Sequence, residues 1–138
     1  MTQDNRPSAS TRSFEEKYVR FRSPEGRAVA RAALGTDLAN GYTTKDQAAA
    51  LAGHLGVGTG DRLLDLGAGR GWPGSFIAET TGCGLVCTDL PMEALLSAQE
   101  NIGALELDAS ATVLVADGRM LPFGDGVFDA VCHADVLC

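Results

Sequence analysis

The sequence contains no apolar run that approaches the roughly 18 residues needed to span a bilayer. Its start, Met1–Ser13, is polar and lacks the apolar core of a secretory signal peptide. Neither an internal repeat nor a low-complexity tract is present. These absences predict a cytoplasmic protein that does not have a membrane as a partner.

The four cysteines lack the spacing of a metal site or of a redox pair. Cys83 and Cys87 are separated by three residues, and Cys132 and Cys138 lie far along the chain from them. We interpret the cysteines as buried thiols that act as small apolar side chains. No metal site is predicted.

Basic residues are scarce outside the N-terminal arm. The net charge is −7, yet seven of the eleven basic residues fall within the first 31 positions. The acidic remainder does not offer the broad basic face that nucleic acid binding requires, so nucleic acid is not expected as a partner. Two interpretations of the arm stay open: a solvated helix face, which we favour, or a contact with an acidic substrate or partner.

The 138 residues, 45% of them hydrophobic, are enough for one domain with a core. We expect a flexible tail over residues 1–12 and N-terminal helices over 13–56, where capping patterns begin at Ser13, Ser23 and Thr44. Over 57–138, short apolar strands alternate with helices, which predicts an α/β fold with a parallel sheet. The expected strands are 62–66, 84–88, 112–116 and 127–132, and the expected helices are 72–80 and 91–103.

A glycine-rich loop, Gly67-Ala68-Gly69-Arg70-Gly71, directly follows the first strand. Ligands of open α/β sheets bind outside the carboxyl ends of the strands, and glycines let a ligand approach the backbone. The loop overlaps a G-x-G-x-x-G string that ends at Gly74 and is typical of dinucleotide sites. However, Pro73 removes a backbone N–H that a pyrophosphate would use, and Asp65 suits a cationic amine or sulfonium better than a phosphate.

A second loop, Thr88-Asp89-Leu90, ends the second strand. Asp89 can accept hydrogen bonds from both hydroxyls of a ribose, which supports nucleoside binding without choosing between cofactors. The alternative role of Asp89 is to cap the helix that Pro91 opens.

The third loop begins at Asp117-Gly118-Arg119, after the third strand. Asp117 can accept a hydrogen bond from an adenine amino group, and the ring walls would be Met120, Leu121 and Phe123. The alternative is an Asp-Gly turn with an apolar plug.

Together the three loops, within residues 42–138, resemble class I S-adenosylmethionine-dependent methyltransferases. The stretches 115–123 and 127–131 are similar to the small-molecule branch, which includes quinone-ring methylases. The resemblance implies a Rossmann-like sheet, S-adenosylmethionine as cofactor and a small-molecule methyl acceptor. Arg70 departs from the family pattern, which usually has Thr there. The implied cofactor-binding residues are Asp65 near the amine; Gly67, Ala68, Gly69 and Gly71 at the methionine part; Asp89 and Leu90 at the ribose; Asp117, Gly118 and Arg119 at the adenine; and Cys132 beside the methyl region.

Methyl transfer from a sulfonium mainly requires alignment of the acceptor, and a base only where the acceptor must lose a proton. His133 is the histidine nearest the expected methyl position and is the candidate catalytic residue, with a lining or packing role as the alternative. Asp135 is expected to cap a following helix. Tyr42 and Thr44 would either fold over the cofactor or only form a helix entry.

The family fold has seven strands in the order 3-2-1-4-5-7-6, and this sequence supplies four. We therefore expect a sheet truncated after its fourth strand, in a fragment that is inactive alone and self-associates through the uncovered strand. Two alternative functions stay open: an NAD(P)-dependent oxidoreductase and a non-catalytic nucleoside-binding or interaction module.

Overall fold

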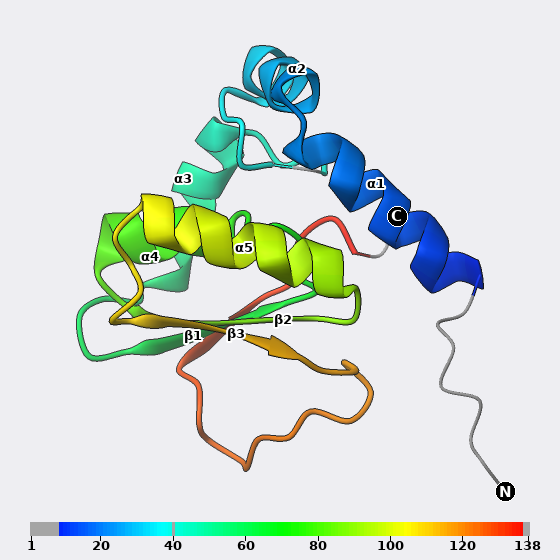
Figure 1. The fold of residues 1–138 in the computed structure, drawn as a ribbon. Coiled ribbons are helices and arrows are strands. Elements are labelled where there is room, and N and C mark those ends of the chain that lie inside the picture. Colours follow the sequence, from blue (N-terminus) through cyan, green and yellow to red (C-terminus); the bar gives the residue numbers. More distant parts are fainter. Residues whose placement is uncertain (1–8, 40, 137–138) are drawn as a thin grey trace, which may run out of the picture.

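The computed structural model describes residues 9–39 and 41–136. Within them lies one parallel sheet with the strand order β3-β2-β1-β4, which confirms the expected α/β class (Figure 1). The strands are β1 (Arg62–Leu66), β2 (Gly84–Asp89), β3 (Ala111–Val115) and β4 (Ala130–Cys132). β4 begins three residues later than expected, because its pairing with β1 starts at the register Leu63 to Ala130.

The helices α3 (Lys45–Leu55), α4 (Gly74–Thr81) and α5 (Met92–Ala104) cover one face of the sheet, and the loop over 116–129 runs along the other (Figure 1). Among the described residues, helices cover only this face of the sheet. Alternate strand residues point toward the helices and form the core. Its largest fully buried apolar side chains are Leu63, Ile77 and Ile102.

Two more helices, α1 (Ala9–Arg22) and α2 (Pro24–Leu34), precede the sheet domain. Helix α1 begins four residues before the expected start at Ser13, and residues 1–8 of the expected tail lie outside the described residues. The other two caps are confirmed. Ser23 Oγ accepts a hydrogen bond from Gly26 N, and Thr44 forms a full capping box with Gln47.

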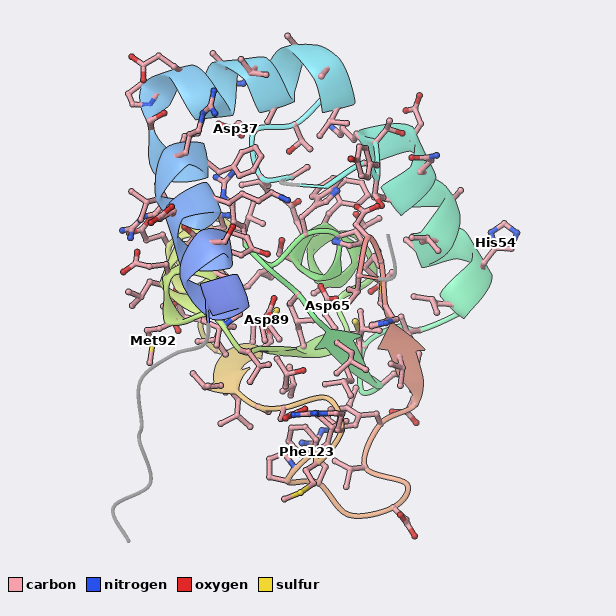
Figure 2. All side chains as sticks on the ribbon, turned by 90° about the vertical axis from the view of Figure 1, so that its right-hand side faces the viewer. Asp37, His54, Asp65, Asp89, Met92 and Phe123 are labelled. Atoms are coloured by element: carbon pink, nitrogen blue, oxygen red, sulfur yellow. The ribbon has the colours of Figure 1, made fainter. Side chains whose placement is uncertain are left out.

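Helix α1 packs against α5 through ion pairs at its C-terminal end. Arg22 Nη1 lies 2.9 Å from Glu93 Oε2, and Arg22 Nη2 also bonds Glu100. These contacts hold α1 near the carboxyl ends of the strands, where Figure 2 shows one end of the helix near Asp89. Within the described residues, no helix is long and apolar enough to cross a membrane.

Candidate functional site

The glycine loop after β1 is folded back onto the end of β2 by its own backbone. Gly67 N and Ala68 N both donate hydrogen bonds to Thr88 O, at 2.8 and 3.0 Å. Gly69 N donates to Asp89 Oδ2 at 2.8 Å. Gly67 and Gly69 have φ angles of 72° and 55°, a left-handed conformation that glycine adopts without steric cost. The spacing of the glycines is thus required by the turn itself.

Gly71, predicted to line the cofactor site, is not among the described residues that line the cavities at this edge of the sheet. A Cβ at Gly71 would lie 3.4 Å from the Ala98 Cβ of helix α5. Its φ of 83° also requires a glycine. Gly71 therefore allows α5 to pack closely against the loop, and its contact with a cofactor stays a prediction.

Asp65 lies behind the loop rather than in front of it. Its side chain is buried, and its Oδ2 accepts a hydrogen bond of 3.0 Å from Gly74 N at the start of α4. Burial, with the nearby Asp89 carboxylate, raises the pKa of Asp65 to about 7. Asp65 thus holds the loop to α4, and its expected contact with a cofactor amine stays a prediction.

Asp89 points to the carboxyl edge of the sheet. Its Oδ2 accepts from Gly69 N, its Oδ1 accepts from Leu90 N at 2.8 Å, and burial raises its pKa. Helix α5 has Pro91 at its N-cap and no side-chain cap, so the alternative capping role of Asp89 is not observed. Each carboxylate oxygen keeps a further acceptor position.

Two cavities open at this edge and meet at Gly67. The first, of about 270 Å³, is here called the loop cavity. The second, of about 320 Å³, is called the edge cavity. The loop cavity is lined by Gly67, Ala68, Gly69, Trp72, Ala134 and Asp135, with Lys17, Tyr18 and Phe21 of α1 and with Gly41 and Tyr42. The edge cavity is lined by Leu66, Gly67, Thr88, Asp89, Leu90, Ala116, Gly118, His133 and Val136.

The third loop differs most from its expected arrangement. Arg119 Nη2 lies 2.6 Å from Asp117 Oδ2, and Arg119 Nε lies 3.0 Å from Asp117 Oδ1. Hydrogen bonds from Arg119 lower the pKa of Asp117 to about 2. Of the three expected residues of this loop, only Gly118 is among the described residues that line the edge cavity. Contacts of Asp117 and Arg119 with an adenine stay predictions.

None of the expected ring walls, Met120, Leu121 and Phe123, is among the described residues that line the edge cavity, so their contact with an adenine stays a prediction. Phe123 packs edge-on against Phe128, with ring centroids 4.9 Å apart, and Arg62 at the start of β1 lies over the Phe128 ring. Figure 2 shows Phe123 on the other side of the sheet from α1. Met120 is 83% exposed. The apolar-plug alternative describes Phe123 better.

The side chains of Cys132 and His133, at the end of β4, have different surroundings. Cys132 pairs with Asp65 in the sheet, and its side chain belongs to the core. Burial raises the pKa of its thiol to about 12. Cys132 is not among the described residues that line either cavity, so its place beside the methyl region stays a prediction. His133 lines the edge cavity, and its Nδ1 lies 2.9 Å from Leu66 O. A carbonyl partner requires a proton on Nδ1, which leaves the Nε2 lone pair available in the neutral ring.

Residues 41–43, here called the strap, are a part of the site that the sequence indicated only weakly. Trp72 Nε1 donates to Thr43 O at 2.8 Å. Asp135 Oδ2 accepts from Tyr42 N, Thr43 N and Thr43 Oγ1, at 3.0, 3.0 and 2.8 Å. Asp135 thus fastens the strap, and the helix that it was expected to cap would lie outside the described residues.

Arg70, the departure from the family pattern, is directed at the N-terminal helices. Its side chain is fully buried, and its Nη1 lies 3.4 Å from Ala39 O. Within the described residues, Nε and Nη2 have no hydrogen-bond partner, and burial lowers the pKa of the guanidinium to about 10. The Arg70 carbonyl accepts a 2.9 Å bond from Asn101 Nδ2 of α5. The substitution therefore alters the support of the loop and not its cavity surface.

Known proteins resemble this chain in sequence. The sterol 24-C-methyltransferase erg6 of Schizosaccharomyces pombe is 33% identical over 81 residues, which cover 59% of this chain and 21% of that protein. The glycine/sarcosine/dimethylglycine N-methyltransferase of Actinopolyspora halophila is 32% identical over 85 residues, covering 62% of this chain and 15% of the relative. The chain thus spans about a fifth or less of the length of these relatives.

Solved structures share the fold. A geranyl diphosphate C-methyltransferase from Streptomyces coelicolor matches 91% of this chain and 54% of its own length with a TM-score of 0.67, at 18% identity. A methyltransferase from Thiobacillus denitrificans, solved with S-adenosyl-L-homocysteine, has a TM-score of 0.51 at 27% identity and covers 54% of this chain and 30% of its own. A family described as methyltransferase domain matches residues 63–138. The glycine loop, the acidic end of β2 and the strand order all lie in this matched part, and the chain belongs to the methyltransferase domain family of S-adenosylmethionine-dependent enzymes.

Proposed function

We propose that this chain supplies the cofactor site of an S-adenosylmethionine-dependent methyltransferase that acts on a small molecule. The observation that carries the proposal is the pair of cavities that meet at Gly67. One is walled by the backbone of a glycine loop, and the other by the carboxylate of Asp89. Such a pair suits a ligand with an amino acid at one end and a nucleoside at the other.

The residues present fit that ligand. Gly67, Ala68 and Gly69 would line its methionine part, because side chains at the two glycines would be strained by their positive φ angles. Asp89 would accept hydrogen bonds from the ribose, with Leu90 beside it, and Gly118 would border the base. When bound, the cofactor supplies a methyl group on a good leaving group, so the protein needs chiefly to align the acceptor and exclude water.

His133 is the proposed acceptor-facing residue. Its bond to Leu66 O orients the ring on the wall of the edge cavity, with Nε2 left to accept a proton or to orient an acceptor hydroxyl or amine. The two curated relatives act on a sterol carbon and on amine nitrogens according to their names, so they favour a small-molecule acceptor without choosing its atom.

The dinucleotide alternative loses support from one contact. The G-x-G-x-x-G string ends at Gly74, whose N–H is already bonded to the buried Asp65 carboxylate. A helix N-terminus occupied by a carboxylate is a poor site for a pyrophosphate.

Calorimetric titration with S-adenosylhomocysteine and with NAD tests the proposal. We expect one molecule of S-adenosylhomocysteine to bind per chain, and the Asp89→Asn variant to bind it at least about tenfold more weakly, because hydrogen bonds to a charged acceptor are lost. Asp108→Asn, which removes an exposed carboxylate outside both cavities, is the matched control. Heat with NAD alone would refute the proposal. Binding of S-adenosylhomocysteine by a longer chain that methylates nothing would favour the non-catalytic module.

A further inference from the structure

The loop cavity carries one positive and one negative side chain. Among the described residues that line it, Lys17 and Asp135 are the charged ones, and the others are glycine, alanine, aromatic or phenolic side chains. A cavity with one ammonium and one carboxylate on its walls complements an amino acid zwitterion, whose two charged groups are attached to one carbon. We infer that Lys17 binds the α-carboxylate, and Asp135 the α-ammonium, of the cofactor's methionine end. This inference rests on the proposed function.

The backbone of the glycine loop offers few donors for a carboxylate. Gly67 N and Ala68 N are bonded to Thr88 O, and Gly69 N is bonded to Asp89. A carboxylate that enters a partly enclosed site needs a donor or a cation, since its desolvation otherwise weakens binding. The three loop residues that line the cavity have their N–H groups committed to the fold, which favours a partner from another wall of the cavity.

Helix α1 forms that other wall. Tyr18 and Phe21 line the cavity together with Lys17, and Tyr18 is buried. The Lys17 Nζ lies 5.9 Å from the centroid of the Phe21 ring, so the ammonium stays near the cavity by a cation–π contact. Arg22 fixes the same helix to Glu93 and Glu100 of α5. Within the described residues, no carboxylate forms an ion pair with Lys17.

The negative wall is held in place by the strap. Three hydrogen bonds from Tyr42 and Thr43 to Asp135 Oδ2 fix the orientation of its carboxylate. Asp65, which the sequence had suggested for the amine, is buried beneath the loop. Asp135 is thus the carboxylate at the cavity surface. Lys17 lies outside the residues matched by the methyltransferase family, 63–138, and Asp135 is separated from it by more than a hundred positions.

The inference is tested by pairing variants with shortened ligands. Calorimetry on the full chain measures binding of S-adenosylhomocysteine and of its decarboxylated analogue, which keeps the amine, thioether and nucleoside. We expect Lys17→Ala to weaken the binding of S-adenosylhomocysteine by about tenfold or more. The same variant should weaken the binding of the decarboxylated analogue by less than about twofold. Lys17→Arg should restore most of the affinity. Arg20→Ala, a basic residue of the same helix that is outside the described lining of the loop cavity, should change neither ligand.

The matching arm uses Asp135→Asn with the analogue that lacks the amine. This variant should weaken the binding of S-adenosylhomocysteine and leave the affinity for the deaminated analogue nearly unchanged. The inference would be overturned if a variant lost as much affinity for the shortened ligand as for the complete one, or if Lys17→Ala lost no affinity. The cofactor proposal would still stand in either case. Failure of the unmodified chain to bind S-adenosylhomocysteine would instead overturn the cofactor proposal, and this inference with it.

Discussion

Gly74 N donates a 3.0 Å hydrogen bond to Asp65 Oδ2, and a Cβ at Gly74 would lie 2.4 Å from that same oxygen. A buried carboxylate and a glycine at the first position of α4 therefore depend on each other. Asp65 provides the acceptor for a helix N-terminus that has no side-chain cap, and Gly74 leaves the room for it. This pair fixes how the glycine loop leaves β1 and enters α4.

The Gly74→Ala variant should be destabilised. Its methyl group would collide with the carboxylate and with the Asp65 Cβ, and overpacking of this kind costs about 1–3 kcal/mol. Gly53→Ala is the control, since a Cβ there has no neighbour within 4 Å among the described residues and Gly53 lies inside helix α3. The control should gain about 0.5–1 kcal/mol. Urea unfolding measures both. An unchanged Gly74→Ala midpoint would show that the loop can shift to accept a methyl group.

The raised pKa of Asp65 predicts a pH dependence of stability. The folded-state pKa is about 7 and the ordinary value is 3.8, so the folded protein holds the proton more tightly than the unfolded chain. The free energy of unfolding should therefore fall as the pH rises from about 4 to about 7, by at most about 1.4 kcal/mol per pH unit from this group.

Asp65→Asn isolates this contribution. The amide can still accept from Gly74 N but does not titrate, so the slope over this pH window should be shallower than in the unmodified chain. Asp89 titrates in the same direction and remains in both proteins. Parallel stability curves for the two proteins would contradict the assignment.

Arg70→Met should be neutral or stabilising. The guanidinium is buried with a single long hydrogen bond to Ala39 O, and replacing a poorly compensated buried charge by an apolar side chain of similar volume often stabilises by about 1–4 kcal/mol. Arg70→Ala is the comparison, because it removes the same charge but leaves a cavity. Thermal unfolding measures the pair. A large loss in Arg70→Met would mean that the charge interacts with Asp37 or Glu100 more strongly than the geometry indicates.

Self-association through β4 stays a prediction with a direct measurement. β4 is the last strand of the described sheet, and Val131 on it is 53% exposed. Sedimentation velocity should show association that grows with concentration and weakens in Val131→Lys, because a charge on an edge strand opposes strand pairing. Val29→Lys, at a 67% exposed position on helix α2, is the control. A protein that stays monomeric at every concentration would contradict this prediction.

Local patterns in the sequence were sufficient for much of the fold. The capping box at Thr44, the Ser23–Pro24 start and the glycine loop depend on residues a few positions apart, and all three form as predicted. The order of strands and helices also predicted that the loops after β1 and β2 would meet, because the carboxyl ends of parallel strands share one edge.

Side-chain direction was harder to predict. Asp65 and Cys132 sit on the core side of neighbouring strands, and Phe123 packs on Phe128 at the opposite end of the sheet. A shift of one residue along a strand reverses the face of a side chain, so a motif can mark a strand end without telling which of its residues reach the ligand.

The sequence by itself determined the elements, their order and the edge of the sheet where a nucleoside cofactor would bind, since these follow from near-neighbour spacing and backbone conformation. Only the tertiary structure decided which walls complete the site. Helix α1 brings Lys17 to the loop cavity, and the strap joins Thr43 to both Trp72 and Asp135. The two contacts of Thr43 join residues that are 29 and 92 positions apart in the sequence. They depend on how the packed helices and strands are oriented, which no local pattern encodes.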